Sequence, residues 1–194
     1  MKKRICFVGV GGQGTLLASR LLGEAVMKAG YDVRVSEVHG MAQRGGVVES
    51  TVMTGGIKSP VISKGMADIL ISTEPVETLR ALDRCNIKTT IITNIDPIEP
   101  VTVKLGLQKY PEVDEILKFI KDRFQNTYAL DATSIAKEAG TAKAANIVLL
   151  GVLIGLNILD ISKDLFIETI KERIKPKFIE ANLKAFELGL NSVA

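Results

Sequence analysis

The sequence is poor in aromatic residues and in clustered charge. It has no tryptophan, and aromatic residues make up 5% of its 194 residues. Proteins that hold single-stranded nucleic acid stack bases on aromatic side chains, so this composition argues against that function. The net charge is only +3, and the sequence contains no basic tail. We therefore expect no nucleic acid among its partners. The hydrophobic fraction of 46% indicates a globular chain.

Cysteine and histidine are equally scarce. The sequence has two cysteines, Cys6 and Cys85, and one histidine. A [4Fe–4S] cluster normally needs four cysteine thiolates, and structural zinc sites need a similar number of cysteine and histidine ligands. We expect this chain alone to bind neither a cluster nor a metal ion, and Cys6 to be an inert core residue.

Long hydrophobic runs are also missing. The longest one, residues 144–159, is shorter than the roughly 20 residues that cross a bilayer. The apolar run Ile5–Val8 is too short for the core of a signal peptide. We expect a cytoplasmic protein without membrane contact. We also expect the 144–159 helix to be buried on one side and to lie near a subunit interface on the other, with the isolated chain forming a homodimer.

Strand-like and helix-like segments alternate along the chain. The segment 47–55 follows a loop of about eight residues, which is too short for a helical crossover, so it should run antiparallel to a neighbour. The remaining strand-like segments carry little polar alternation, which indicates a sheet that is covered on both faces. These patterns predict one domain over residues 1–194: an α/β, three-layer α/β/α sandwich with a Rossmann-like mixed, mostly parallel sheet. The other expected strands are residues 4–9, 31–37, 67–73, 88–94 and 127–133.

A glycine-rich loop joins the first strand to the first helix. Gly9, Gly11 and Gly14 form the pattern G-x-G-x-x-G, which in dinucleotide enzymes provides the turn, the close approach of a ligand and the packing of helix on strand. The helix N-terminus that follows can bind an anion. We take Gly9, Gly11, Gly12, Gln13 and Gly14 as a candidate phosphate loop. The alternative is that these glycines serve only turn geometry and packing.

A second polar loop follows the second strand. Residues 36–50, SEVHGMAQRGGVVES, contain Glu37, His39, Gln43, Arg44, Gly45 and Gly46. Glu37 lies near the position of the ribose-binding acid in NAD enzymes, and the guanidinium of Arg44 suits a phosphate or carboxylate. In a doubly wound sheet this loop should lie beside the glycine loop. Alternatives remain open: a surface ion pair for Arg44, a hydrogen-bonded structural role for His39, and a simple turn for Gly45–Gly46.

Both loops, together with AANIVLLGVLIG at residues 144–155, resemble a known family. They are similar to the γ-type subunit of the pyruvate, ketoisovalerate and 2-oxoglutarate:ferredoxin oxidoreductases. The resemblance is strongest to the equivalent module, the β subunit of indolepyruvate:ferredoxin oxidoreductase, and it spans most of the chain. It implies a multi-subunit enzyme that oxidatively decarboxylates a 2-oxo acid to an acyl-CoA and passes electrons to ferredoxin. The acid could be an aryl pyruvate, 2-oxoglutarate, pyruvate or a branched-chain acid.

The resemblance also implies where the cofactors lie. Thiamine diphosphate, magnesium, [4Fe–4S] clusters and coenzyme A would be on partner subunits or shared with them, because this sequence has no G-D-G…N thiamine motif and too few cysteines. The chain would complete the active site without a catalytic residue of its own and would be inactive in isolation. Its two loops would border the coenzyme A entrance, with Glu37 and His39 at the rim, or face thiamine diphosphate on a partner.

Two other functions are compatible with the glycine loop. One is a free-standing NAD(P)- or FAD-dependent oxidoreductase, and the other is a scaffold subunit without a ligand. A bound flavin would colour the protein yellow, and NAD would raise its melting temperature by mass action. A scaffold would show neither effect.

Overall fold

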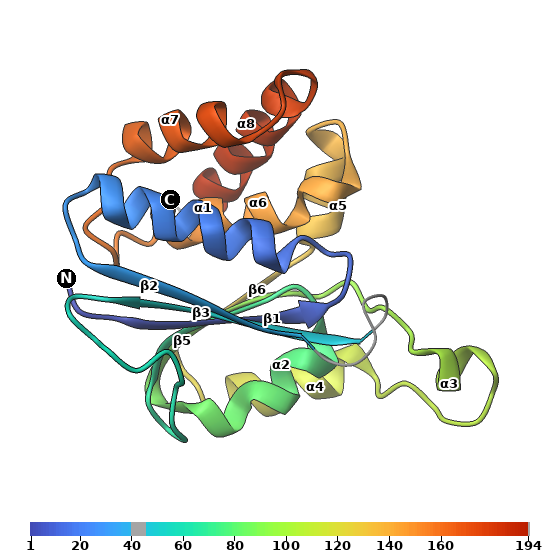
Figure 1. Ribbon diagram of the computed structural model, residues 1–194. Helices are drawn as coiled ribbons and strands as arrows, with labels where there is room; N and C mark the ends of the chain where they lie inside the picture. Colours follow the sequence, from blue (N-terminus) through green and yellow to red (C-terminus); the bar gives the residue numbers. More distant parts are fainter. Residues whose placement is uncertain (40–45, 194) are drawn as a thin grey trace.

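The structure is a computed structural model that describes residues 1–39 and 46–193. It has three layers, with a six-stranded sheet between two sets of helices (Figure 1). This confirms the predicted α/β sandwich. The strand order is β2-β3-β1-β4-β5-β6. In chain order the strands are β1 (Arg4–Val10), β2 (Val33–His39), β3 (Val47–Thr54), β4 (Ala67–Ser72), β5 (Cys85–Asn94) and β6 (Thr127–Leu130).

One strand of the sheet runs against the others. β1, β4, β5 and β6 pair in parallel, whereas β3 is antiparallel to both β1 and β2. The antiparallel direction expected for residues 47–55 is therefore confirmed. β3 also separates β2 from β1, so the first two parallel strands are not neighbours as they are in a doubly wound sheet.

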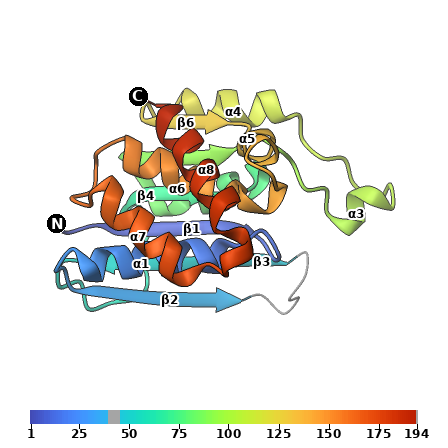
Figure 2. The same cartoon turned by 90° about the horizontal axis from the view of Figure 1, so that it is seen from above.

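Helices cover both faces of the sheet. Figures 1 and 2 show the larger layer over one face, with α8 crossing above α6 and α7 beside α1. Its helices are α1 (Thr15–Lys28), α5 (Ala132–Glu138), α6 (Ala145–Gly155), α7 (Lys163–Arg173) and α8 (Pro176–Asn191). The opposite face carries α2 (Pro75–Ala81) and α4 (Val113–Lys121). A one-turn helix, α3 (Val101–Lys104), stands apart from both layers.

The alternation of side chains along β1 divides the core in two. Ile5 and Phe7 belong to the apolar cluster beneath α1 and α6, whereas Cys6 and Val8 belong to the cluster beneath α2 and α4. All four side chains are buried, as expected for a central strand with both faces covered. The glycine loop therefore starts from a strand that is fixed on both sides.

The most apolar helix is enclosed within the chain. Every residue from Asn146 to Ile154 in α6 is buried, largely because α8 packs directly on it. Glycines make this approach possible: a Cβ on Gly151 would lie 2.2 Å from the carbonyl oxygen of Phe186, and one on Gly189 would lie 2.1 Å from that of Val148. The expectation that this helix is buried on one side only is therefore wrong over Asn146–Ile154, and the expected nearby subunit interface stays a prediction. No helix among the described residues is long and apolar enough to cross a membrane.

Candidate functional site

β1 and β4 are neighbours in the middle of the sheet, and their carboxyl ends lie side by side. From β1 the chain continues to β2 and β3 on one side, and from β4 it continues to β5 on the other. In open α/β sheets, ligands bind outside the carboxyl ends of the strands at such a reversal. The segments that border this point are the glycine loop at 11–14, the turn at 73–74 and the segment 95–100 after β5.

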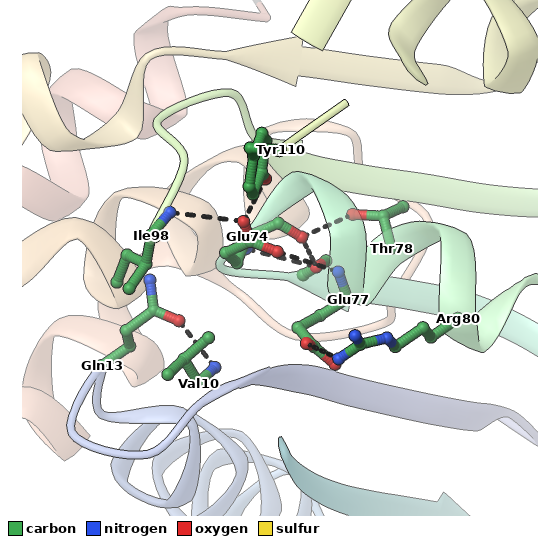
Figure 3. Close-up of polar contacts among 9 residues, drawn as sticks. Val10, Gln13, Glu74, Glu77, Thr78, Arg80, Ile98 and Tyr110 are labelled. Atoms are coloured by element: carbon green, nitrogen blue, oxygen red, sulfur yellow. Dashed lines mark hydrogen bonds and ion pairs between the residues drawn. The ribbon is translucent and has the colours of Figure 1, made fainter. Parts of the chain in front are cut away.

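Gln13 ties the glycine loop to the turn after β4. Its side-chain oxygen accepts hydrogen bonds from the backbone N–H of Val10 and from the hydroxyl of Thr73, both at 2.7 Å. Its amide nitrogen donates to the carbonyl of Thr73 at 2.9 Å. Figure 3 shows this side chain folded back toward Val10. The bulky Gln13 is thus part of the turn itself, and the N–H of Val10 is already used within the protein.

Gly9 and Gly14 serve close packing, but with partners other than those expected. Gly9 belongs to β1, and a Cβ there would lie 1.9 Å from the hydroxyl oxygen of Thr73, so its role is to make room and not to form the turn. Gly14 has a φ of 78°, which favours glycine, and a Cβ on it would lie 2.6 Å from the side-chain nitrogen of Asn146 in α6. That nitrogen donates to the carbonyl of Gly14 at 2.9 Å. Gly14 therefore packs on a neighbouring helix and not on the strand.

The N-terminus of α1 has backbone donors that no side chain among the described residues caps. Gly14 is its N-cap and has no side chain to accept from the first turn, and the first turn has no acidic residue. The first N–H groups of a helix have no partner inside the helix, and they carry the positive end of its dipole. They border a hollow of about 250 Å³, lined by Val10, Gly12, Gly14, Thr15, Leu16 and Val48. This geometry fits an anionic group.

Two buried polar atoms belong to Thr15, which lines this hollow, and to Asn146, which contacts Gly14. Thr15 is 3% exposed and Asn146 is 2% exposed. Neither the hydroxyl oxygen of Thr15 nor the side-chain oxygen of Asn146 has a hydrogen-bond partner among the described residues. Buried polar groups are usually paired, so these two atoms mark a place where the described chain leaves bonding capacity unused.

The C-terminal end of the second polar loop contacts the glycine loop. The N–H of Gly11 donates to the carbonyl of Gly46 at 2.8 Å, so this donor is not free for a ligand. Gln43, Arg44 and Gly45 lie outside the described residues. The backbone of His39 pairs with Val48 of β3.

Glu37 is placed differently from the acid of an NAD site. β3 separates its strand from β1, and Arg20 of α1 binds both carboxylate oxygens, at 2.9 and 3.2 Å. The resemblance of Glu37 to the ribose-binding acid of NAD enzymes is therefore one of sequence position only.

The sequence interpretation missed a buried carboxylate next to the glycine loop. Glu74 caps α2 and is 1% exposed. One of its oxygens accepts from the backbone N–H of Glu77 at 2.9 Å, and the other accepts from the N–H of Ile98 at 3.3 Å and from the hydroxyl of Tyr110 (Figure 3). Burial, and then the bond to Glu74, raises the pKa of Tyr110. The signal in the sequence was T-E-P directly after the strand-like ADILIS, with proline at the first helical position.

Glu77 and Arg80 extend this cluster toward solvent. The guanidinium of Arg80 lies 2.5 Å from one carboxylate oxygen of Glu77, while the other oxygen is buried without a partner among the described residues. Burial raises the pKa of Glu77 despite the nearby arginine. The cluster borders a second hollow of about 240 Å³, whose lining includes Val10 and Glu74.

The two thiols are unsuited to chemistry. Cys6 and Cys85 are both buried. Burial raises the pKa of Cys6 strongly and that of Cys85 to about 12, so both remain protonated thiols at neutral pH. Within 1–39 and 46–193, no group of three or more histidine, cysteine, aspartate or glutamate residues could hold a metal ion.

Comparison with known proteins shows the family to which this chain belongs. Residues 4–192 match the family described as Pyruvate ferredoxin/flavodoxin oxidoreductase. The chain belongs to this family. It is 40% identical over 191 residues to indolepyruvate oxidoreductase subunit IorB of Archaeoglobus fulgidus, covering 98% of this chain and 95% of that one. The resemblance to the γ-type subunits is confirmed, and this chain is a subunit of that type in the 2-oxoacid:ferredoxin oxidoreductases.

Solved structures share the fold. The γ subunit of a keto/oxoacid ferredoxin oxidoreductase from Geobacter sulfurreducens PCA superposes with a TM-score of 0.73 at 24% identity, covering 98% of both chains. A 2-oxoglutarate:ferredoxin oxidoreductase from Magnetococcus marinus gives a TM-score of 0.73 at 18% identity. That match covers 99% of this chain but 31% of the other one, so the same module there forms part of a longer chain.

Proposed function

We propose that this γ-type subunit belongs to an enzyme that oxidises an aryl pyruvate of the indolepyruvate type. The identity of 40% over nearly the whole length of an indolepyruvate oxidoreductase subunit supports this substrate class. In this proposal the 2-oxo acid is decarboxylated to an acyl-CoA, and the electrons pass to ferredoxin. The chain acts as one domain over residues 1–194 and contributes to the active centre without a catalytic side chain of its own.

The cofactors of the reaction would lie on the larger subunits or at their contact with this chain. Thiamine diphosphate with magnesium supplies the electron sink for decarboxylation, and [4Fe–4S] clusters carry the electrons. Among these groups, the described residues fit an anionic group of coenzyme A or of thiamine diphosphate. The free N–H groups at the N-terminus of α1 and the hollow beside them support that assignment.

We favour coenzyme A as the source of this anion. The bond between Gly11 and Gly46 brings the end of the second loop to the glycine loop, so Arg44, two residues earlier, is close in sequence to this contact. Arg44 would contact the diphosphate, with Glu37 and His39 at the rim of the entrance. The Magnetococcus marinus enzyme was solved with 2-oxoglutarate, coenzyme A and succinyl-CoA bound, which supports the same ligand in a protein of this fold.

The substrate proposal is tested on the enzyme assembled with the larger subunits from the same source. Reduction of ferredoxin is measured with an aryl pyruvate, 2-oxoglutarate, pyruvate and a branched-chain 2-oxo acid. We expect the highest kcat/KM with the aryl pyruvate. We also expect the isolated chain to be colourless and to show no turnover. A preference for one of the other acids would contradict the substrate class, and turnover by the isolated, metal-free chain would contradict the subunit role.

The loop proposal is tested with Arg44→Ala in the same assembled enzyme. A charge-assisted hydrogen bond contributes about 1.5–3 kcal/mol, so the apparent KM for coenzyme A should rise about ten- to a hundredfold while thiamine loading stays intact. The matched control is Arg123→Ala, because Arg123 is exposed and lies after α4, ahead of β6 and thus at the opposite edge of the sheet. An unchanged KM would exclude Arg44 from this role, and lost assembly would place the loop in a docking contact.

A further inference from the structure

An arm leaves the body of the protein after β5. Figures 1 and 2 show the segment that carries α3 standing away from both helical layers, at the edge of the sheet where β1 enters the glycine loop. We define the arm as residues 99–109, between Ile98 and Tyr110. No step of the proposed reaction makes use of it.

The tip of the arm is internally ordered. Gly106 has a φ of 71°, its N–H donates to the carbonyl of Val103 at 2.9 Å, and the N–H of Leu107 donates to that of Thr102 at 2.9 Å. These two bonds make a Schellman motif, the usual closure of a helix end. The hydroxyl of Thr102 also donates to Gln108 at 2.9 Å. The tip is therefore a preformed turn.

This turn presents two leucines to solvent. Leu105 is 67% exposed and Leu107 is 72% exposed. Neither leucine contributes to the two apolar clusters of the fold. Lys104 and Lys109 flank the pair, so the tip is apolar with a basic border.

Glu74 fixes both ends of the arm. The same carboxylate oxygen accepts from the N–H of Ile98, just before the arm, and from the hydroxyl of Tyr110, just after it. Glu74 is 1% exposed, and its other oxygen is held by the first turn of α2 (Figure 3). Because both ends of the arm are held and its tip is ordered, the arm loses less entropy when it docks.

We propose that the arm inserts Leu105 and Leu107 into an apolar pocket with an acidic rim on a larger subunit of the complex. This rests on the proposed function, in which such subunits exist and meet this chain at the carboxyl edge of the sheet. A second copy of the chain is a poorer occupant. An apolar hollow of about 270 Å³ lies between Leu17 and Phe178, but its lining includes Lys143, Arg173 and Lys175, and like charge would oppose Lys104 and Lys109.

The experiment measures binding of the full-length chain to the purified larger subunits from the same source. The test variant is Leu105→Ser/Leu107→Ser. The control is Val61→Ser/Ile87→Ser, because Val61 and Ile87 are 67% and 77% exposed but lie near the opposite edge of the sheet. We expect the Kd to rise about tenfold for each leucine removed and to stay within about twofold for the control. The melting temperature of both variants should match that of the wild type.

A second measurement tests whether Glu74 fixes the two ends of the arm. Tyr110→Phe removes one of the two bonds that Glu74 makes at the ends of the arm. Amide hydrogen exchange of residues 99–109 in the isolated chain should become faster, and the Kd for the larger subunits should rise by a smaller factor than in the leucine variant. Equal exchange in Tyr110→Phe and the wild type would overturn the role of Glu74.

The outcomes separate the two proposals. If wild-type chain and larger subunits do not bind, the proposed function fails and the arm proposal fails with it. If the wild type binds and the leucine variant binds equally well, the arm proposal alone is overturned. It is also overturned if the isolated wild-type chain is a dimer by sedimentation and the leucine variant is a monomer, because the arm then holds a second copy.

Discussion

Replacing Gly151 by alanine tests whether close packing of α8 on α6 keeps the most apolar helix inside this chain. An added Cβ would lie 2.2 Å from the carbonyl oxygen of Phe186 and 2.8 Å from the backbone nitrogen of Leu190. Both atoms belong to the backbone of α8, so no side-chain rotation relieves the contact. The two helices would have to separate by about 1 Å to restore ordinary van der Waals distances.

The size of the effect follows from two opposing contributions. Alanine is favoured over glycine inside a helix by about 1 kcal/mol, which stabilises the variant. Overpacking in a core costs about 1–3 kcal/mol, and more where the neighbour cannot move. Backbone of a buried helix is such a neighbour, so we expect a net loss of about 2 kcal/mol for Gly151→Ala. For a chain of 194 residues, this lowers the melting temperature by about 4–8 °C.

The matched control is Gly23→Ala in α1. There an added Cβ would meet a side-chain methyl of Val35 at 2.5 Å, and Val35 is 39% exposed, so the neighbour is a partly exposed side chain and not helix backbone. We expect its melting temperature to lie within about 3 °C of the wild type, because the gain in helix propensity offsets the adjustment. Calorimetry measures both variants. Sedimentation of Gly151→Ala should reveal association through the loosened α6 face. A melting temperature of Gly151→Ala at or above that of the wild type would refute this reasoning.

Three further predictions concern Glu77, Gln13 and the two cysteines. Burial raises the pKa of Glu77 in the folded chain, so its contribution to stability is complete below the unfolded value of about 4.5 and is lost as the pH rises through the folded value. Glu77→Gln should therefore be more stable relative to wild type at pH 7 than at pH 4 in urea melts, and an equal difference at both would contradict this. Gln13→Ala removes three hydrogen bonds to Val10 and Thr73, and should lower the free energy of unfolding by about 1–3 kcal/mol; no change would show that the loop closes without them. Cys6 and Cys85 should react with a thiol reagent only in denaturant, and fast labelling of the native chain would contradict their burial.

Local pattern predicted most of the fold because the deciding interactions are close in sequence. The antiparallel direction of β3 followed from a loop too short for a helical crossover. The position of β3 between β2 and β1 did not follow, since no local signal states which strand is the neighbour. The same limit explains the error at α6: apolar residues on all sides predict burial, but the cover came from α8, about 30 residues later, through glycines at 151 and 189.

The candidate site was predicted where its residues form one motif and was missed where they are spread out. The glycine loop lies between β1 and α1, as its spacing indicated. The use of its donors was not predictable, because the side-chain oxygen of Gln13 accepts from the N–H of Val10 and the carbonyl of Gly46 accepts from the N–H of Gly11. Glu74 was missed for the same reason, since its partners at 98 and 110 are far away in the sequence.

The antiparallel β3 also explains why a dinucleotide-like pattern occurs here without the geometry of a dinucleotide site. A ribose-binding acid needs the second parallel strand directly beside the first, and β3 takes that place while Arg20 binds Glu37. The return of the chain along β3 instead brings Gly46 onto the N–H of Gly11, which closes one side of the loop. What stays open among the described residues is the N-terminus of α1, with a hollow of about 250 Å³ beside it. A loop reduced in this way suits one phosphate of a ligand that is otherwise held by another subunit.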